Sequence, residues 1–215
     1  MDLVQRMVRQ LAGVSLDESK GYLVESRLSQ LAEKAGLGTF NEVYFQVRYG
    51  NDQVFNRHLL DAITTHETTF FRDGAPFDLL RERWLPDALA ARARAGRPGQ
   101  LRIWSAACST GQEPYSIAMT VLEALGDAAH DVRILATDIS PLSLETASRG
   151  LYSELDMARA ARPNLLAKYT QREGNGHRIV ERVRRLVTFR ECNLTAPFVG
   201  LGPFDLVFLR NVLIY

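Results

Sequence analysis

The stretch Ile103-Trp-Ser-Ala-Ala-Cys-Ser-Thr-Gly-Gln-Glu-Pro-Tyr-Ser-Ile117 decides the fold of this chain. An apolar run from Leu101 to Trp104 leads into small residues, the turn closes on Gly111, and Pro114 opens an apolar-periodic segment. Proline is favoured at the start of a helix, because its missing N–H group has no partner in the first turn. The pattern predicts a strand, a tight turn and a helix whose free N–H groups can receive polar groups of a ligand.

An ordinary strand-to-helix connection shows the same local pattern, so the elements that follow decide between the two readings. Strands are predicted over 101–105 and 132–137, and helices over 114–125 and 141–149. This alternation predicts a parallel sheet with helices packed on it and right-handed crossovers. Two further core strands are predicted over 186–190 and 204–209. The predicted fold class is therefore α/β.

Polar residues follow the predicted strands at their carboxyl ends. Asp138 ends the second strand, where an acidic residue commonly accepts hydrogen bonds from ribose hydroxyls. Its alternative role is to cap the next helix, but Ser140-Pro141 already offers a cap and a first turn, so we favour the ligand role. Asn193 and Asn211 follow the third and fourth strands, and each precedes an aliphatic residue. Their amides can hydrogen-bond a base edge or an amino acid group.

The first third of the chain is predicted to form four short helices in a small domain. Apolar stripes end at glycines, and capping boxes stand at Ser15-Leu-Asp-Glu18 and Thr39-Phe-Asn-Glu42. The exposed face carries basic residues, which are either a solvated face or a docking face for an acidic partner; they are Arg6, Arg9, Lys20, Arg27 and Lys34.

Two segments interrupt these patterns. Thr64-Thr-His-Glu-Thr-Thr-Phe-Phe-Arg72 offers hydroxyls, an imidazole, aromatic rings and a cation, and it is either an interdomain linker or a segment lying over a ligand. Asn175-Gly176 is a strong hairpin signal and predicts a small antiparallel excursion inserted into the α/β pattern. Between them, residues 75–95 are predicted to form one or two helices.

Composition excludes several classes of protein. The 26 lysines and arginines nearly balance the 25 aspartates and glutamates, so no global field directs the chain to nucleic acid or a membrane surface. The two cysteines form neither a disulfide framework nor a metal-type spacing, and free thiols suit the cytoplasm. No run approaches the length of a membrane span. We expect a cytoplasmic protein with no nucleic-acid partner, no membrane insertion and no bound metal.

Four motifs together point to a family: Thr64 to Arg72, Trp104-Ser-Ala-Ala-Cys-Ser-Thr-Gly-Gln-Glu-Pro-Tyr-Ser116, Ala136-Thr-Asp-Ile139 and Arg210-Asn-Val-Leu-Ile-Tyr215. With them the chain resembles, essentially end to end, the chemotaxis receptor-glutamate methyltransferases (the CheR family), which use S-adenosylmethionine. The resemblance implies a Rossmann-like methyltransferase fold. It places a helical domain at 1–72, linker helices at 73–100 and the α/β domain at 101–215, with an inserted antiparallel β-subdomain at 164–186.

The resemblance also implies the cofactor S-adenosylmethionine and the product S-adenosylhomocysteine. The residues expected to contact the cofactor are His66, Thr68, Arg72, Glu113, Asp138, Asn193, Leu194, Asn211 and Val212. His66 stands where the family usually has Asn. Arg72 is also the candidate catalytic residue, because it either meets the methionine carboxylate or steers the incoming acceptor. The implied acceptors are glutamates on the cytoplasmic methylation helices of chemoreceptors, which the helical domain faces in the family.

A complete domain of this family continues past the fourth strand, and the resemblance implies three further strands. We therefore expect the 101–215 domain to be C-terminally incomplete and its fourth strand to be an exposed edge open to self-association. The alternative to an enzyme is a non-catalytic module that binds S-adenosylmethionine or a receptor. A nicotinamide dehydrogenase would normally show Gly-x-Gly-x-x-Gly after the first strand, and Ser105 to Glu113 does not.

Overall fold

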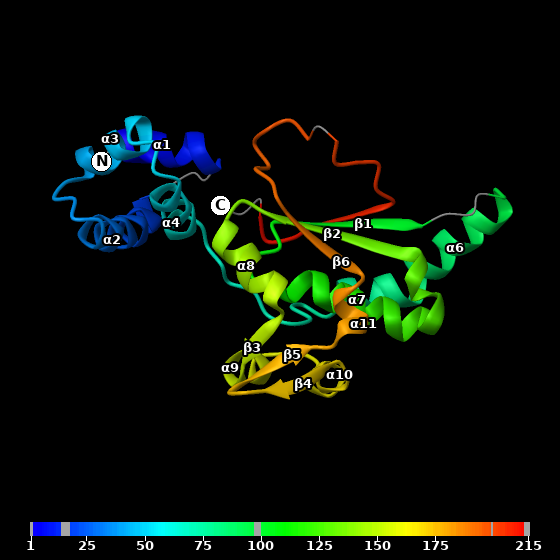
Figure 1. Cartoon of the computed structure of the whole chain (residues 1–215). Coiled ribbons are helices and arrows are strands. Elements are labelled where there is room, and N and C mark those ends of the chain that lie inside the picture. Colours follow the sequence, from blue (N-terminus) through cyan, green and yellow to red (C-terminus); the bar gives the residue numbers. More distant parts are fainter. Residues whose placement is uncertain (1, 14–17, 97–99, 199, 213–215) are drawn as a thin grey trace.

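The computed structural model describes residues 2–13, 18–96, 100–198 and 200–212. A helical domain comes first in the chain and lies beside an α/β domain (Figure 1). The helical domain contains α1 (Asp2–Ala12), α2 (Glu18–Lys34), α3 (Phe40–Tyr49) and α4 (Gln53–Ile63). Its buried cluster includes Met7, Val8, Leu28, Val43, Phe55, Leu59 and Ile63. The four predicted short helices are thus confirmed.

Capping explains where these helices begin. The Thr39 side chain accepts a hydrogen bond from the backbone N–H of Glu42 at 3.3 Å, which is one half of the predicted capping box at the start of α3. The Glu42 side chain accepts from the N–H of Gly38 at 2.7 Å, and not from that of Thr39 as the complete box requires. Asp52 caps α4 by accepting from the N–H groups of Val54 and Phe55. The capping box predicted at Ser15 lies outside the described residues.

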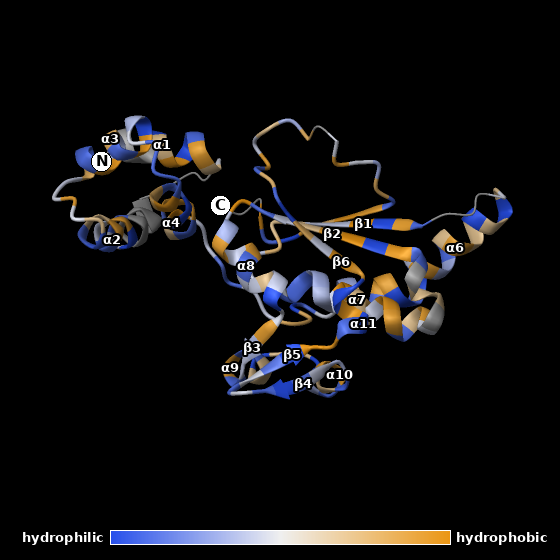
Figure 2. Cartoon of the chain, viewed as in Figure 1, coloured by the Kyte–Doolittle hydropathy of each residue, from blue (hydrophilic) through white to orange (hydrophobic). Residues whose placement is uncertain are grey.

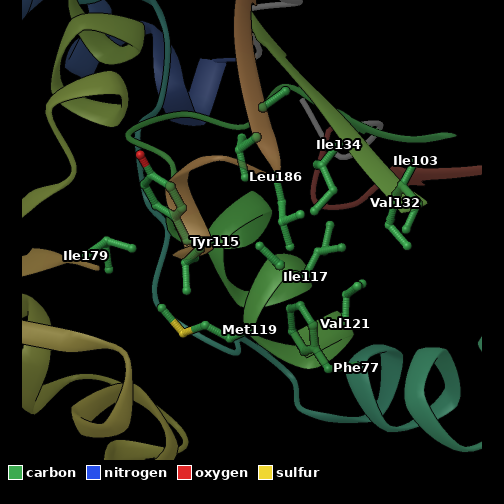
Figure 3. Packing of buried hydrophobic residues seen from close by; sticks show 14 of the residues in the cluster. Phe77, Ile103, Tyr115, Ile117, Met119, Val121, Val132, Ile134, Ile179 and Leu186 are labelled. Atoms are coloured by element: carbon green, nitrogen blue, oxygen red, sulfur yellow. The ribbon is translucent and has the colours of Figure 1, made fainter. Parts of the chain in front are cut away.

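The α/β domain is built on a parallel sheet, as the alternating pattern predicts. Its strands are β1 (Leu101–Ala106), β2 (Val132–Asp138), β6 (Val187–Glu191) and β7 (Leu206–Leu209), in the order β6-β2-β1-β7. Helices α7 (Gln112–Leu125) and α8 (Pro141–Arg149) follow β1 and β2 and lie on one face of this sheet (Figure 1). Figure 3 shows Ile117 and Val121 of α7 among the buried side chains of the strands.

The helices between the two domains belong to the core of the α/β domain. This region contains α5 (Ala75–Leu79), a π-helical turn (Leu80–Trp84) and α6 (Leu85–Arg94). Phe77, Leu80 and Leu85 are buried in the same apolar cluster as Ile103 and Ile117. The helices at 75–94, within the segment 73–100 that the sequence indicates as linker helices, therefore pack as part of the α/β domain, because their apolar side chains contact α7.

The antiparallel subdomain begins earlier than the sequence indicates. Its sheet has the order β3-β5-β4, with β3 (Leu151–Ser153), β4 (Thr170–Glu173) and β5 (Gly176–Ile179), and the predicted hairpin joins β4 to β5. Strand β3 precedes the 164–186 range, and its three residues are too few to show a strand period. Short helices α9 (Glu154–Ala158) and α10 (Pro163–Lys168) pack against the sheet, and α11 (Glu181–Arg184) follows it and packs on α7. Strand β4 is largely hydrophilic (Figure 2).

The second face of the parallel sheet carries a smaller cluster. Trp104, Ala106 and Leu201 are buried there, and the long connection between β6 and β7 contributes Phe204. Strand β7 is an edge of the sheet and exposes Val207 and Leu209. Within the described part of the chain, none of the helices has the length and apolarity that a bilayer crossing requires.

Candidate active site

A cavity of about 500 Å³ opens at the carboxyl ends of the parallel strands. Its walls come from the end of α1, the segment 63–72, the loop after β1, the end of β2, and the connections that follow β6 and β7. All nine predicted contact residues line it: His66, Thr68, Arg72, Glu113, Asp138, Asn193, Leu194, Asn211 and Val212. The volume is that of an ordinary small-molecule site.

The loop after β1 has a strained backbone. Ala107 and Ser109 adopt positive φ angles of 55° and 51°, which cost non-glycine residues about 1–3 kcal/mol each. Backbone hydrogen bonds hold this conformation, since the N–H of Cys108 donates to the carbonyl oxygen of Thr137 at 2.8 Å. Strain of this kind persists only where surrounding contacts hold the backbone conformation. Here the strained conformation places the backbone of the loop at the cavity.

Asp138 ties this loop to the end of β2. Its Oδ2 accepts from the N–H of Ser109 at 2.7 Å, and its Oδ1 accepts from the N–H of Ser140 at 2.9 Å. Burial raises the pKa of this carboxyl, although the backbone hydrogen bonds act in the opposite direction. The predicted cap of α8 is confirmed, because Ser140 Oγ accepts from the N–H of Ser143. A carboxylate offers about four acceptor sites, so Asp138 can accept a further hydrogen bond from a ligand.

Glu113 stands in the first turn of α7, where a negative charge is favoured by the helix dipole. Its Oε1 accepts from Ser105 Oγ at 2.8 Å, and its Oε2 meets Arg210 Nη1 at 3.1 Å. Burial raises the pKa of Glu113, while Ser105 and Arg210 oppose the shift. Arg210 also donates to the carbonyl oxygen of Arg72 and to Asp73 Oδ2, both at 2.7 Å. It therefore joins the end of β7 to the 64–72 segment.

Arg210, Ser105 and Trp104 also belong to the site, and no local pattern in the sequence marks any of the three individually. All three stand inside the motifs that carry the family resemblance, which was the available signal. Trp104 donates from Nε1 to Thr137 Oγ1 at 2.9 Å and packs edge-on against Phe198, with ring centroids 5.4 Å apart. These rings give the cavity an apolar wall beside its carboxylates.

His66 uses both ring nitrogens within the protein. Nε2 lies 2.9 Å from the carbonyl oxygen of Asp61 and 3.2 Å from Asp61 Oδ1, and Nδ1 lies 2.9 Å from Ser143 Oγ. Asp61 Oδ1 also accepts from Ser140 Oγ at 2.8 Å. His66 thus connects α4 of the helical domain to α8, and any polar contact to a ligand must compete with these partners.

Asn193 also makes a hydrogen bond between the α/β domain and the helical domain. Its Nδ2 donates to the carbonyl oxygen of Leu11 at 2.8 Å, and its Oδ1 accepts from the N–H and Oγ1 of Thr195. The end of α1 is thereby held at the rim of the cavity, where Ala12 and Gly13 complete the wall. The sequence could not reveal this contact, because Leu11 and Asn193 lie far apart along the chain.

Two family models match this chain, one over each of its two domains. Residues 66–215 match the family model described as "CheR methyltransferase, SAM binding domain". Residues 1–64 match the model described as "CheR methyltransferase, all-alpha domain". This chain belongs to the CheR methyltransferase family. The α/β domain that carries the cavity is therefore the S-adenosylmethionine-binding domain of a CheR protein, and the helical domain is the all-α domain of the same family.

Curated members of the CheR family are similar along nearly the whole chain. "Chemotaxis protein methyltransferase 1" of Pseudomonas aeruginosa is 40% identical and matches 100% of this chain and 78% of its own length. "Chemotaxis protein methyltransferase" of Vibrio anguillarum is 42% identical over 98% of this chain and 76% of its own length. The protein of the same name from Borreliella burgdorferi is 36% identical over 94% and 72%.

The cavity suits the cofactor of the CheR family. S-adenosylmethionine carries a diol and an ammonium group, for which buried carboxylates are suitable acceptors, and a carboxylate, for which arginine is a suitable donor. Asp138, Glu113 and Arg72 supply these groups, and the wall at Trp104 offers apolar surface to a planar ring. Among the described residues no cluster of metal-ligating side chains could hold an ion, and both cysteines are free.

The raised pKa values of Asp138 and Glu113 predict how cofactor affinity depends on pH. We expect binding of S-adenosylmethionine to weaken as pH falls through the raised values, because both carboxyls lose their charge at a higher pH than exposed carboxyls do. Calorimetric titration at a series of mildly acidic to neutral pH values measures this. Affinity that stays constant until exposed carboxyls titrate would contradict the prediction.

The same pKa shifts predict the opposite trend for the stability of the unliganded protein. Between the ordinary and the raised pKa values, the folded chain binds more protons than the unfolded chain. The contribution of these two groups to the free energy of unfolding therefore decreases as pH rises through that window. Denaturation of the wild type beside Asp138→Asn, which cannot titrate at this position, isolates the contribution of Asp138.

Proposed function

We propose that this chain transfers the methyl group of S-adenosylmethionine to glutamate side-chain carboxylates of chemoreceptors in the cytoplasm, giving glutamate methyl esters and S-adenosylhomocysteine. The observation that carries the proposal is the convergence of nine expected contact residues on one cavity, with the buried carboxylate of Asp138 and the partly buried carboxylate of Glu113 at its wall. The relatives named as chemotaxis protein methyltransferases support the receptor as the substrate.

In this proposal, different residues of the cavity bind different parts of the cofactor. Asp138 holds the ribose diol, because two backbone N–H groups already fix its carboxylate at the cavity wall. Glu113 accepts the ammonium group, and Ser105 and Arg210 keep its carboxylate oriented. Leu194 and Val212 pack on the adenine ring, beside the backbone of Asn193 and Asn211.

The chain needs no general base for this reaction. When bound, the cofactor supplies an electrophilic methyl group on its sulfonium. An unperturbed glutamate has a pKa of about 4.3, so the acceptor is already anionic at neutral pH. What the protein must do is align the acceptor with the methyl group and remove water from its carboxylate.

Arg72 is the residue of the cavity best placed to act on a carboxylate. It is half-buried, and its Nη1 donates to the carbonyl oxygen of Glu67 at 2.9 Å, which orients the guanidinium and leaves further N–H groups for a ligand. In this proposal Arg72 binds either the methionine carboxylate or the acceptor glutamate. Arg72→Lys separates the two, because loss of the first raises the Kd of the cofactor and loss of the second raises only the KM of the receptor.

The acceptor helix approaches from the side of the helical domain in this proposal. Arg9, Arg27 and Lys34 are exposed there and would attract the acidic methylation helices. Arg27 also donates to the carbonyl oxygen of Thr64 at 2.9 Å, where the 64–72 segment begins. The basic face therefore connects directly to the wall of the cavity.

Transfer of a radiolabelled methyl group to cytoplasmic receptor fragments tests the proposal. We expect label that is released as methanol by mild base, as an ester requires, and no label when the receptor glutamates are replaced by alanine. Cofactor binding without transfer to any receptor fragment would instead identify a non-catalytic binding module. Failure to bind S-adenosylmethionine at all would overturn the site assignment itself.

A further inference from the structure

Tyr152 connects the antiparallel sheet to the loop that follows β1. It lies in β3 and is 3% exposed, and its Oη donates to the carbonyl oxygen of Thr110 at 2.7 Å. Neither Tyr152 nor Thr110 lines the cavity, whereas Ser109 and Glu113 on either side of Thr110 do. The hydrogen bond thus contacts the loop on the side that faces away from the cavity.

The loop requires such support because its backbone is strained. Ala107 and Ser109 have positive φ angles, and Gly111 has a φ of 95°. A Cβ atom at Gly111 would lie 2.9 Å from Tyr152 Oη and 2.7 Å from the Cβ of Ala147, so the loop is seated tightly on both side chains. Contacts from β2 and from the 64–72 segment hold the start of the loop, while Tyr152 holds its end.

The position of Tyr152 is itself well determined. Its ring packs edge-on against Phe70, with centroids 4.8 Å apart, and against Tyr115 at 6.2 Å. Its backbone pairs with His177 in β5. The hydroxyl is therefore presented to Thr110 by the whole antiparallel sheet and not by a mobile side chain.

We propose that Tyr152 is a positioning residue for cofactor binding, through which the antiparallel sheet holds the 107–111 loop in the conformation that Asp138 and Glu113 need. The inference rests on the proposed function for the identity of the cofactor. Without the hydroxyl, the carbonyl oxygen of Thr110 loses its donor. The strained loop then relaxes and moves the N–H of Ser109 away from Asp138, which that N–H group orients. The sheet therefore contributes to cofactor affinity although it lies outside the cavity.

Two tyrosine-to-phenylalanine variants of the full chain test this inference. Tyr152→Phe removes the hydroxyl and keeps the ring contacts. Tyr115→Phe is the matched control, because its Oη donates at the same 2.7 Å to the carbonyl oxygen of Ala147 in α8, which is not in the loop. Tyr152→Phe removes one neutral buried hydrogen bond. Tyr115→Phe removes one such bond together with the interaction of its hydroxyl with Arg184, so the control should lose at least as much stability.

Calorimetric titration with S-adenosylmethionine and S-adenosylhomocysteine is the first readout. We expect Tyr152→Phe to bind both ligands roughly fivefold more weakly, the effect of one neutral hydrogen bond, and Tyr115→Phe to bind them like the wild type. In the transfer assay, the KM for the cofactor should rise and kcat should change little. Equal affinity in all three proteins, or equal weakening in both variants, overturns the inference.

Hydrogen exchange without ligand is the second readout and does not depend on activity. The amides of Ser109 and Gly111 should exchange faster in Tyr152→Phe than in the wild type or Tyr115→Phe, and unchanged exchange there overturns the proposed support. A wild type that binds the cofactor but methylates no receptor would defeat the proposed function and leave this inference to be decided by the binding data. A wild type that binds neither ligand would overturn both.

Discussion

Asp138→Ala is expected to abolish measurable binding of S-adenosylmethionine. The substitution removes the acceptor proposed for the ribose diol, and it also leaves the N–H groups of Ser109 and Ser140 without their partner. Hydrogen bonds to a charged group contribute about 1.5–3 kcal/mol each, so losing the ribose contacts alone weakens binding by more than roughly 100-fold. The loss of loop orientation adds to this. Calorimetric titration of the purified variant measures the effect.

Two variants separate the ligand role of Asp138 from its structural role. Asp138→Asn keeps one oxygen for a backbone N–H group and removes the charge, so its affinity should lie between those of the wild type and Asp138→Ala. Asp205→Asn alters a carboxylate that pairs with Arg92 just before β7 begins, away from the cavity, and should leave the affinity unchanged. Undiminished binding by Asp138→Ala would refute the assignment.

Glu113→Gln is expected to reduce kcat/KM for the cofactor by about 100-fold, mostly through KM. The glutamine has the same shape and can still accept from Ser105, so the main change is the loss of a partly buried negative charge that attracts the ammonium group. Arg210 keeps Asp73 and the carbonyl oxygen of Arg72 as partners, so the variant should remain folded. Steady-state kinetics with varied cofactor, beside thermal denaturation, measures both effects.

The charge and the geometry of Glu113 can be tested apart. Glu113→Asp restores the charge on a shorter side chain and should recover only part of the affinity, because its carboxylate cannot reach both Ser105 and Arg210 as before. S-adenosylhomocysteine carries the same ammonium group, so its affinity should fall in parallel with that of S-adenosylmethionine. A Glu113→Gln variant with wild-type KM would exclude Glu113 as the ammonium acceptor.

Local pattern was sufficient for most elements of the α/β domain. The strand predicted over 132–137 is β2 less its last residue, and the helix predicted over 141–149 is α8. Parallel strands buried on both faces read as nearly continuous apolar runs, which makes them visible in a sequence. Strand β3 is not visible in the sequence because it has three residues, and its pairing of Tyr152 with His177 joins segments far apart in the chain.

The sequence by itself determined the alternation of strands and helices, the cavity at the strand ends and the family. These depend on local periodicity and on the residue types at strand ends, and both can be recognised from short stretches of sequence. Only the tertiary structure decided which polar atoms are already used: Asn193 holds α1, His66 joins α4 to α8, Arg210 braces Glu113, and Tyr152 supports the loop. The physical reason is that a hydrogen bond forms between atoms that meet in space, and chain folding brings these partners together from distant positions.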